Sequence, residues 1–467
     1  MLVEQHIGPM GLRVFPLGPR EVDGSIAGMR GTATHSALTR SAFRVTSSVP
    51  VVAYQFNPLD NVDVFSNDAS LLKPVEALGG VGEQLTPAYV VLGWPQTIAL
   101  TDDPNTNFGG DDGQALRAFL TLIGTRPDTR VRVTPTARIV GAPGIPETKP
   151  GEVLEMTLQP FDVLNLETDD FNADFTGTRV DTSGPIVAFS GSEASDAPHF
   201  EDLSQRACCA DHLEEQLDPI ATAGKTFVAP VAFNRSLAVR SAGGDLGLVE
   251  MQEVFRVIAA TEAGARVRTT LDGSHAEFEL ESVADFREIR TSRDFLLESD
   301  EPVMLSNISP SQQAAGVPNN FPGGDPSFVI IPPVEQYRSE YVFLTPQFYA
   351  FDFLRIMAPP GARIALDGED VERSPDCTAD DQASIRQTMP AAARERFVVW
   401  RCQLSFPIID PNASTAEGFL RDGNQNDGVH RIVSTEPVGV LVDGFDRNVS
   451  YAYAAGTELV HIVPIIR

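Results

Sequence analysis

The amino-acid sequence predicts an all-β fold, built from tandem antiparallel β-sandwich modules with long polar loops and little helix. Apolar and polar residues alternate over short stretches, which is the period of a half-buried strand. Turn residues separate these stretches at intervals of roughly 8 to 15 positions, as in β-sandwiches. One motif recurs along the chain, and 467 residues are too many for one hydrophobic core.

The recurring motif has the form apolar-x-apolar-x-Ser/Thr-x-x-Pro-Val/Ile, in some copies only approximately. Its four copies contain Pro50, Pro185, Pro302 and Pro437, and each is followed by an apolar run. Because proline has no N–H to give to a strand ladder, it belongs at a turn or at the first position of a strand. The motif therefore predicts a strand, a tight turn and a second, buried strand.

Hairpin-like pairs recur between the proline motifs, at residues 119–133, 255–269 and 353–366. Residues 114–123 alone could form an amphipathic helix, but their counterparts have strand spacing, and so we expect a strand there too. Short helices are expected at residues 203–217 and 380–397, the second broken by Pro390.

These repeats divide the chain into four predicted modules. An incomplete β module at residues 1–88 is followed by β-sandwich modules at 89–223, 224–336 and 337–467. The first module contains only closing strands, and half a sandwich cannot bury its inner face. We therefore expect an intact gene to extend further upstream, and this segment to be held by its neighbour or partly loose.

The charge of the chain argues against two classes of partner. Thirty-five Lys and Arg residues against 64 Asp and Glu residues give a net charge of −29. This field repels the phosphates of nucleic acids and anionic lipid headgroups. The apolar runs fall short of the roughly 18 to 20 residues that span a membrane, and no secretory signal can be read at the start.

Four cysteines are too few to hold a protein of this size together by disulfides. Cys377 and Cys402 are a candidate disulfide that would contribute roughly 3 kcal/mol through chain entropy, with two reduced cysteines as the alternative. Cys208 and Cys209 lie near two histidines, but adjacent cysteines do not fit a tetrahedral zinc site. A disulfide or free thiols are favoured there, and we predict no metal ligands.

A long polar loop follows the strand after each proline, at residues 57–70, 190–211, 306–327 and 443–450. Tandem sandwiches bring such loops to equivalent ends, which is how this architecture forms recognition surfaces. Connector loops without a ligand are the alternative. The candidate binding residues are Asn57, Asp60, Asn61, Asp63, Ser192, Glu193, Asp196, His199, Asp211 and His212.

Cofactor and catalytic motifs are weak. Asp102, Asp103, Asp111 and Asp112 lie among asparagine and glycine and could hold Ca²⁺, but the spacing is not that of an EF-hand loop, and a solvated turn is favoured. Ser192 follows an apolar strand without the Gly-x-Ser-x-Gly spacing of a hydrolase. We predict no catalytic residues and no cofactor; a hydrolase near Ser192 and His212, or a structural surface component without a ligand, is the alternative.

The stretch from Cys209 to Pro219, Cys-Ala-Asp-His-Leu-Glu-Glu-Gln-Leu-Asp-Pro, is followed by Gly224-Lys-Thr-Phe-Val. In this order of motifs the chain resembles the IgGFc-binding protein N-terminal domain family, in its bacterial branch of secreted or lipid-anchored surface proteins. The resemblance implies a secreted or cell-surface adhesion protein that binds a protein or a glycan. Asp218 replaces a usual proline and residues 190–207 lack a usual cysteine, and so immunoglobulin binding itself is not implied.

Overall fold

The computed structural model describes most of the chain, and nearly all of its regular structure is antiparallel strand. The predicted all-β fold class is confirmed. Within the described part no helix is long and apolar enough to cross a membrane. The described residues are 3–18, 21–26, 29, 32–59, 61, 66–79, 84–96, 116–200, 203–379, 395–413, 415 and 419–463.

The first set of strands forms two facing sheets, in the order β4-β9-β6-β7 and β1-β8-β5-β10-β11. Side chains of both sheets meet in one core, which includes Leu120 from one sheet and Val131 from the other. This packing buries the alternating apolar residues that the sequence pattern predicts. The strands are β1 (Ala37–Thr39), β4 (Thr86–Val90), β5 (Ala118–Gly124), β6 (Thr129–Thr134), β7 (Leu154–Leu158), β8 (Val163–Glu167), β9 (Arg179–Thr182), β10 (Ile186–Ser195) and β11 (Asp211–Gln216).

The second set pairs its strands in the same order, β12-β17-β14-β15 on one side and β16-β13-β17-β18 on the other. Its core includes Phe255 and Phe295, whose rings meet edge to face with centroids 5.0 Å apart. The strands are β12 (Gly224–Ala229), β13 (Glu253–Ala259), β14 (Ala265–Thr269), β15 (Glu277–Leu280), β16 (Phe286–Thr291), β17 (Phe295–Ile308) and β18 (Phe328–Ile331).

The third set follows the same pairing order, β19-β27-β21-β22 and β24-β20-β27-β28, with β23 added beside β24 and a separate β25–β26 hairpin. The disulfide between Cys377 and Cys402 joins β23 to β24 at directly paired positions. The strands are β19 (Arg338–Thr345), β20 (Phe351–Ala358), β21 (Ile364–Leu366), β22 (Glu369–Asp370), β23 (Cys377–Ala379), β24 (Val398–Gln403), β25 (Ser405–Ile409), β26 (Leu420–Gln425), β27 (Gly428–Asp446) and β28 (Val449–Ala454).

Pro302 and Pro437 of the motif each mark the point at which one continuous strand changes partners, whereas residues 40–52, around Pro50, form no strand. β17 pairs with β14 before Pro302 and with β13 and β18 after it, and β27 changes from β21 to β20 and β28 around Pro437. The predicted tight turn is wrong at these two prolines, because the strand bends from one sheet to the other without ending. At Pro185 the two strands β9 and β10 are separate.

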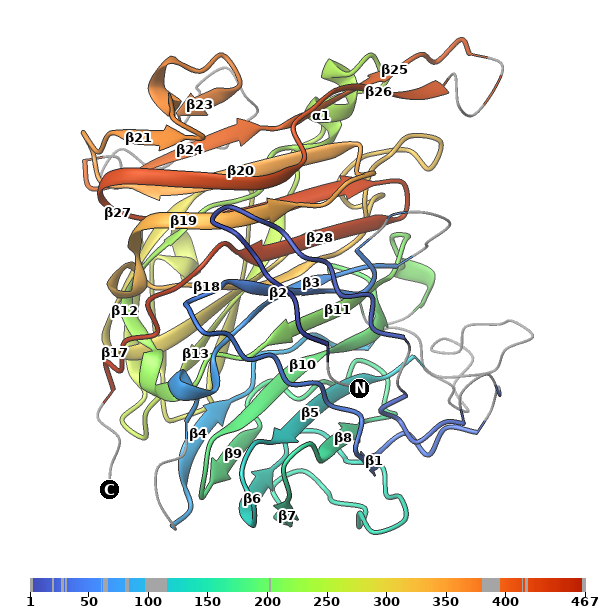
Figure 1. Ribbon diagram of the computed structural model, residues 1–467, viewed down its shortest axis with the longest axis vertical. Helices are drawn as coiled ribbons and strands as arrows, with labels where there is room; N and C mark the ends of the chain where they lie inside the picture. The colour runs from blue at the N-terminus through green and yellow to red at the C-terminus, as the bar shows by residue number, and fades with distance from the viewer. Residues whose placement is uncertain are drawn as a thin grey trace.

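The N-terminal segment packs onto other parts of the chain. Its strands β2 (Ala53–Phe56) and β3 (Ala69–Leu72) pair with each other, and β3 lies between β11 and β28 (Figure 1). The Tyr54 hydroxyl donates to the backbone oxygens of Val342 and Ala455. Leu71 is buried in the core of the second set, and so the segment shares the cores of its neighbours. The division into four modules stays a prediction.

The helix prediction for residues 203–217 is wrong. That stretch holds a single 3₁₀ turn, η2, and the strand β11, while most of the second expected helix, residues 380–394, lies outside the described residues. A helix that we did not predict, α1 (Arg235–Ser241), begins at Asn234, whose side chain accepts a hydrogen bond from Leu237 N. The 3₁₀ turns are η1 (Val75–Ala77), η2 (Leu203–Gln205), η3 (Ile220–Thr222), η4 (Gly273–His275), η5 (Val334–Gln336) and η6 (Val371–Arg373).

Gly191 lets β10 and β11 approach closely, and we expect Gly191→Ala to destabilise the fold. A Cβ there would lie 1.7 Å from the backbone oxygen of Leu213, so the strands would have to separate. The expected loss of unfolding free energy is toward the upper end of the roughly 1–3 kcal/mol that overpacking costs. Gly247→Ala is the control, because nothing lies within 4 Å of a Cβ there. Equal denaturant midpoints for the two variants would contradict this close approach.

Candidate functional site

A cleft of about 1240 Å³ opens between the first and second sets of strands. This volume lies above the roughly 300–1,000 Å³ of most small-molecule sites, so the cleft can accommodate an extended ligand. Its walls come from the turn after β4, the connections around β6 and β9, strands β13 and β16, and the loop after β10. Lining residues include Pro95, Arg138, Asp174, His199, Arg256 and Glu288.

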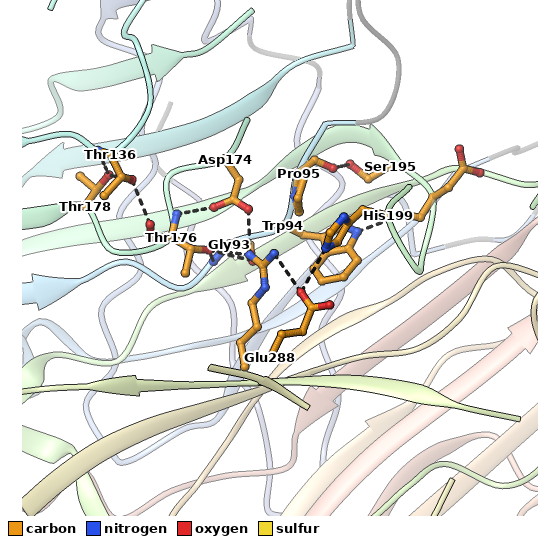
Figure 2. A network of polar contacts seen from close by, with 12 residues as sticks. Gly93, Trp94, Pro95, Thr136, Asp174, Thr176, Thr178, Ser195, His199 and Glu288 are labelled. Atoms are coloured by element: carbon orange, nitrogen blue, oxygen red, sulfur yellow. Dashed lines mark hydrogen bonds and ion pairs between the residues drawn. The ribbon is translucent and has the colours of Figure 1, made fainter. Parts of the chain in front are cut away.

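Arg256 holds the floor of the cleft together, although only 3% of its side chain is exposed. Its guanidinium donates to Gly93 O at 2.9 Å, to Thr176 Oγ1 at 2.8 Å and to Asp174 Oδ2 at 2.8 Å. A longer contact of 3.4 Å reaches Glu288 Oε2. Figure 2 shows these partners gathered around one point, which joins β13 and β16 to the loops of the first set.

Aromatic rings cover the same guanidinium. Arg256 Cζ lies 4.6 Å from the ring centre of Trp94 and 5.3 Å from that of Phe286. Trp94 is fully buried, whereas Phe286 remains 39% exposed at the wall of the cleft. Both rings are within the range of a cation–π contact with Arg256, and Phe286 presents apolar surface to the cleft.

His199 and Glu288 form the second charged contact of the cleft. His199 Nε2 lies 3.2 Å from Glu288 Oε2, and Arg290 Nε donates to Glu288 Oε1 at 3.0 Å. Burial works to raise the pKa of Glu288, but the hydrogen bond from His199 and the charge of Arg256 outweigh it and lower this pKa to about 2. Glu288 is therefore a fixed negative charge at neutral pH.

The described residues of the loop after β10, 196–200 and 203–210, form one wall of the cleft and are anchored at both ends. Near its start, Trp94 Nε1 donates to Asp196 O at 2.9 Å, and Ala197 N donates to Ser311 Oγ at 3.0 Å. Near its end, Cys208 N donates to Gln313 Oε1 at 2.9 Å. Cys208 and Cys209 are joined by a disulfide.

The predicted binding residues of β10 and its loop divide between the cleft and the protein interior. His199 lines the cleft, and the adjacent Asp196 is buried, with its Oδ2 accepting from Arg206 Nε at 2.7 Å. Ser192 and Glu193 belong to strand β10 and not to a loop. The Ser192 hydroxyl is buried, and burial, with the charge of a neighbouring carboxylate, raises the pKa of Glu193 to about 7.

A second pair of predicted residues meets away from the cleft. Asn57 Nδ2 lies 3.4 Å from His212 Nε2, and His212 N donates to Ser66 Oγ at 2.8 Å. Asp211 is fully buried and its carboxyl group accepts from Asn67 N at 2.8 Å. Asp211 therefore belongs to the protein interior and not to an exposed surface. His212 belongs to strand β11, and so it does not lie in one of the predicted loops.

Asn61 lies apart from both places. Asn61 Nδ2 donates to Phe348 O at 2.9 Å and to Asp446 Oδ2 at 3.0 Å, beside the third set of strands. Asp60 and Asp63 lie outside the described residues, as do the four candidate calcium ligands Asp102, Asp103, Asp111 and Asp112. Among the described side chains, no three His, Cys, Asp or Glu residues are grouped so that they could hold a metal ion.

Sequence reasoning missed the central residues of the cleft. Arg256 interrupts the apolar run Val254-Phe-Arg-Val-Ile258, and a charged residue in a buried strand needs a partner. That signal could have pointed to Arg256. Glu288 and Asp174 have no such mark, because they lie in polar stretches whose composition is that of any surface.

One of the comparisons with known proteins shows a family. A family model described as IgGFc binding protein matches residues 68–444. A search of curated proteins gives no significant match. Among solved structures, an anti-sigma factor domain-containing protein from Clostridium clariflavum is aligned over 86% of this chain and 98% of that chain, at 7% identity and a TM-score of 0.11. A score this low carries no argument about fold or function.

Proposed function

Because the chain belongs to the IgGFc binding protein family, we propose that it is a non-enzymatic binding protein of the cell surface or extracellular space. Its ligand is a polypeptide, held in the cleft between the first and second sets of strands. The family match supports the binding role. The cellular location of the protein, the polypeptide ligand and the cleft as its binding site go beyond the family match.

The observation that carries the proposal is the prearranged wall of the cleft. Arg256 and Glu288 are already paired and hydrogen-bonded in the free chain, so a ligand does not have to order them. Phe286 lines the cleft with a partly exposed ring, and aromatic residues are enriched in protein interfaces. The net charge of −29 favours the approach of a basic partner over an acidic one.

Two hydroxyl groups, those of Ser192 and Thr345, bear on the alternative of a hydrolase. Ser192 Oγ is buried and has no hydrogen-bond partner among the described residues, so none of them is in place as the base that activates a serine. Thr345 Oγ1 lies 2.9 Å from His430 Nε2, and His430 Nδ1 lies 2.7 Å from Asp367 Oδ2. This arrangement resembles a triad, but Thr345 is fully buried and a substrate could not reach it.

The proposal is tested with Phe286→Ala and the control Phe161→Ala, since both phenylalanines are 39% exposed and only Phe286 lines the cleft. The probes are purified immunoglobulin G Fc fragment, an array of extracellular proteins and a glycan array. We expect a protein on this panel to bind wild type and Phe161→Ala. Phe286→Ala should bind it at least about 10-fold more weakly, as for an interface hot spot.

Two results would contradict this function. One is a panel on which no protein binds the wild-type chain or only glycans do, which would remove the polypeptide ligand. The other is equal affinity of the two variants, which would place the binding surface away from the cleft.

A further inference from the structure

We propose that the Cys208–Cys209 disulfide is a redox-reactive site, which exchanges with dithiol reductants and thereby sets the conformation of the loop that walls the cleft. The two cysteines are neighbours in the sequence, so their bond closes a ring within one dipeptide. It connects no distant segments and removes almost no chain entropy from the unfolded state. Stabilisation of the global fold is therefore not the role of this disulfide.

The second disulfide provides the contrast. Cys377 and Cys402 join two strands and are 8% and 0% exposed. Cys208 and Cys209 are both partly exposed. Thiol–disulfide exchange requires an attacking thiolate to reach one sulfur, and accessibility therefore favours reaction at Cys208–Cys209.

The position of this pair couples it to the cleft. Cys208 N donates to Gln313 Oε1, and Cys208 O accepts from Gln313 N at 2.8 Å, so the pair fixes the end of the loop to the second set of strands. Gln205 and Ala207, directly before it, line the cleft. At the other end of the loop, the His199 ring meets Trp94 edge-on with centroids 5.2 Å apart.

The reaction has a simple balance. A thiolate of the dithiol attacks one cysteine sulfur and gives a mixed disulfide, and its second thiol then displaces the cysteine. The dithiol leaves oxidised to its own disulfide. It has given up two electrons and two protons, and the protein has gained two thiols. With the ring opened, the S–S bond no longer restrains the φ and ψ angles of the dipeptide, so the two hydrogen bonds to Gln313 should weaken and the loop should lose its fixed end.

The experiment uses the folded chain and dithiothreitol under native conditions, followed by alkylation and peptide mass spectrometry. Cys208 and Cys209 should be alkylated only after reduction, while Cys377 and Cys402 stay protected. Amide exchange in residues 197–207 should rise about 10-fold on reduction. In a Trp400→Phe background, Trp94 is the sole tryptophan, and its emission should change at the same time.

The double variant Cys208→Ser with Cys209→Ser is the control, because dithiothreitol should leave its Trp94 emission unchanged. Alkylation before reduction would overturn the proposal, since no disulfide would then exist. Resistance of the pair to dithiothreitol, or reduction without a change in the loop, would overturn it equally. None of these readouts needs a ligand, so the outcome is independent of the proposed binding function.

Discussion

Acidification from pH 8 to pH 5.5 is expected to stabilise the folded chain by at least about 3 kcal/mol. Four buried carboxyl groups carry this effect. Burial raises the pKa of Glu215 and of Asp352 to about 8, and that of Glu193 and of Asp325 to about 7. In the unfolded chain the same groups titrate near pH 4.

The sign follows from which state holds the proton. Between about pH 4 and pH 8 the folded chain binds protons that the unfolded chain has released, so unfolding is opposed. This contribution is fully present below the unfolded pKa and is lost as the pH rises through the folded values. Glu288 has the opposite shift, but its pKa of about 2 places its contribution below pH 5. The measurement is chemical denaturation at several pH values above the sequence pI of about 4.5.

Asp352 allows a variant to test the origin of the effect. Its carboxyl group is fully buried and accepts from Ser405 Oγ at 2.6 Å and from Tyr451 Oη at 2.5 Å. Asp352→Asn keeps a similar shape without a proton to lose. The dependence of stability on pH should therefore fall by up to about 1.4 kcal/mol per pH unit across this window. Stability that is constant or falls from pH 8 to pH 5.5 in the wild-type chain would contradict the buried-carboxyl account.

The sequence predicted the fold class because strand alternation and the recurring proline are local signals. It failed at β11, where the residues Asp-His-Leu-Glu-Glu-Gln are typical of a polar helix. Asp211, Glu215 and Gln216 are nevertheless buried there, and their side chains accept from backbone N–H groups of residues in or beside β3 and β18. Such partners lie far away in the chain, and no local propensity contains them.

The same limit applies to the candidate site. His199 was identified from its place in a loop after the proline motif. Its partner Glu288 lies 89 residues further along the chain, in β16 of the second set. Single-sequence reasoning finds residues of suitable chemistry, but the meeting of two sets of strands decides which of them share a cleft.

Arg355→Ala is expected to cost about 3–5 kcal/mol of unfolding free energy at pH 8, the range for breaking a buried ion pair from one side. The Arg355 side chain is 2% exposed, and its Nε donates to Asp443 Oδ1 at 2.8 Å. Its NH1 group donates to Pro230 O at 3.0 Å and to Asn307 Oδ1 at 3.2 Å, which ties the third set of strands to the second. Truncation leaves a buried carboxylate without its counter-charge, and denaturant titration measures the loss.

Two further variants separate the charge from the lost side-chain volume. Asp443→Asn in the Arg355→Ala background removes the stranded charge and should restore part of the stability. Arg431→Ala removes an arginine whose ion pair with Glu340 is exposed, and should cost at most about 1 kcal/mol. Burial already raises the pKa of Asp443 against the charge of Arg355, so loss of Arg355 raises it further. The defect should therefore be smaller at pH 5.5 than at pH 8, and a defect equal at both would show that packing, and not the unpaired carboxylate, causes it.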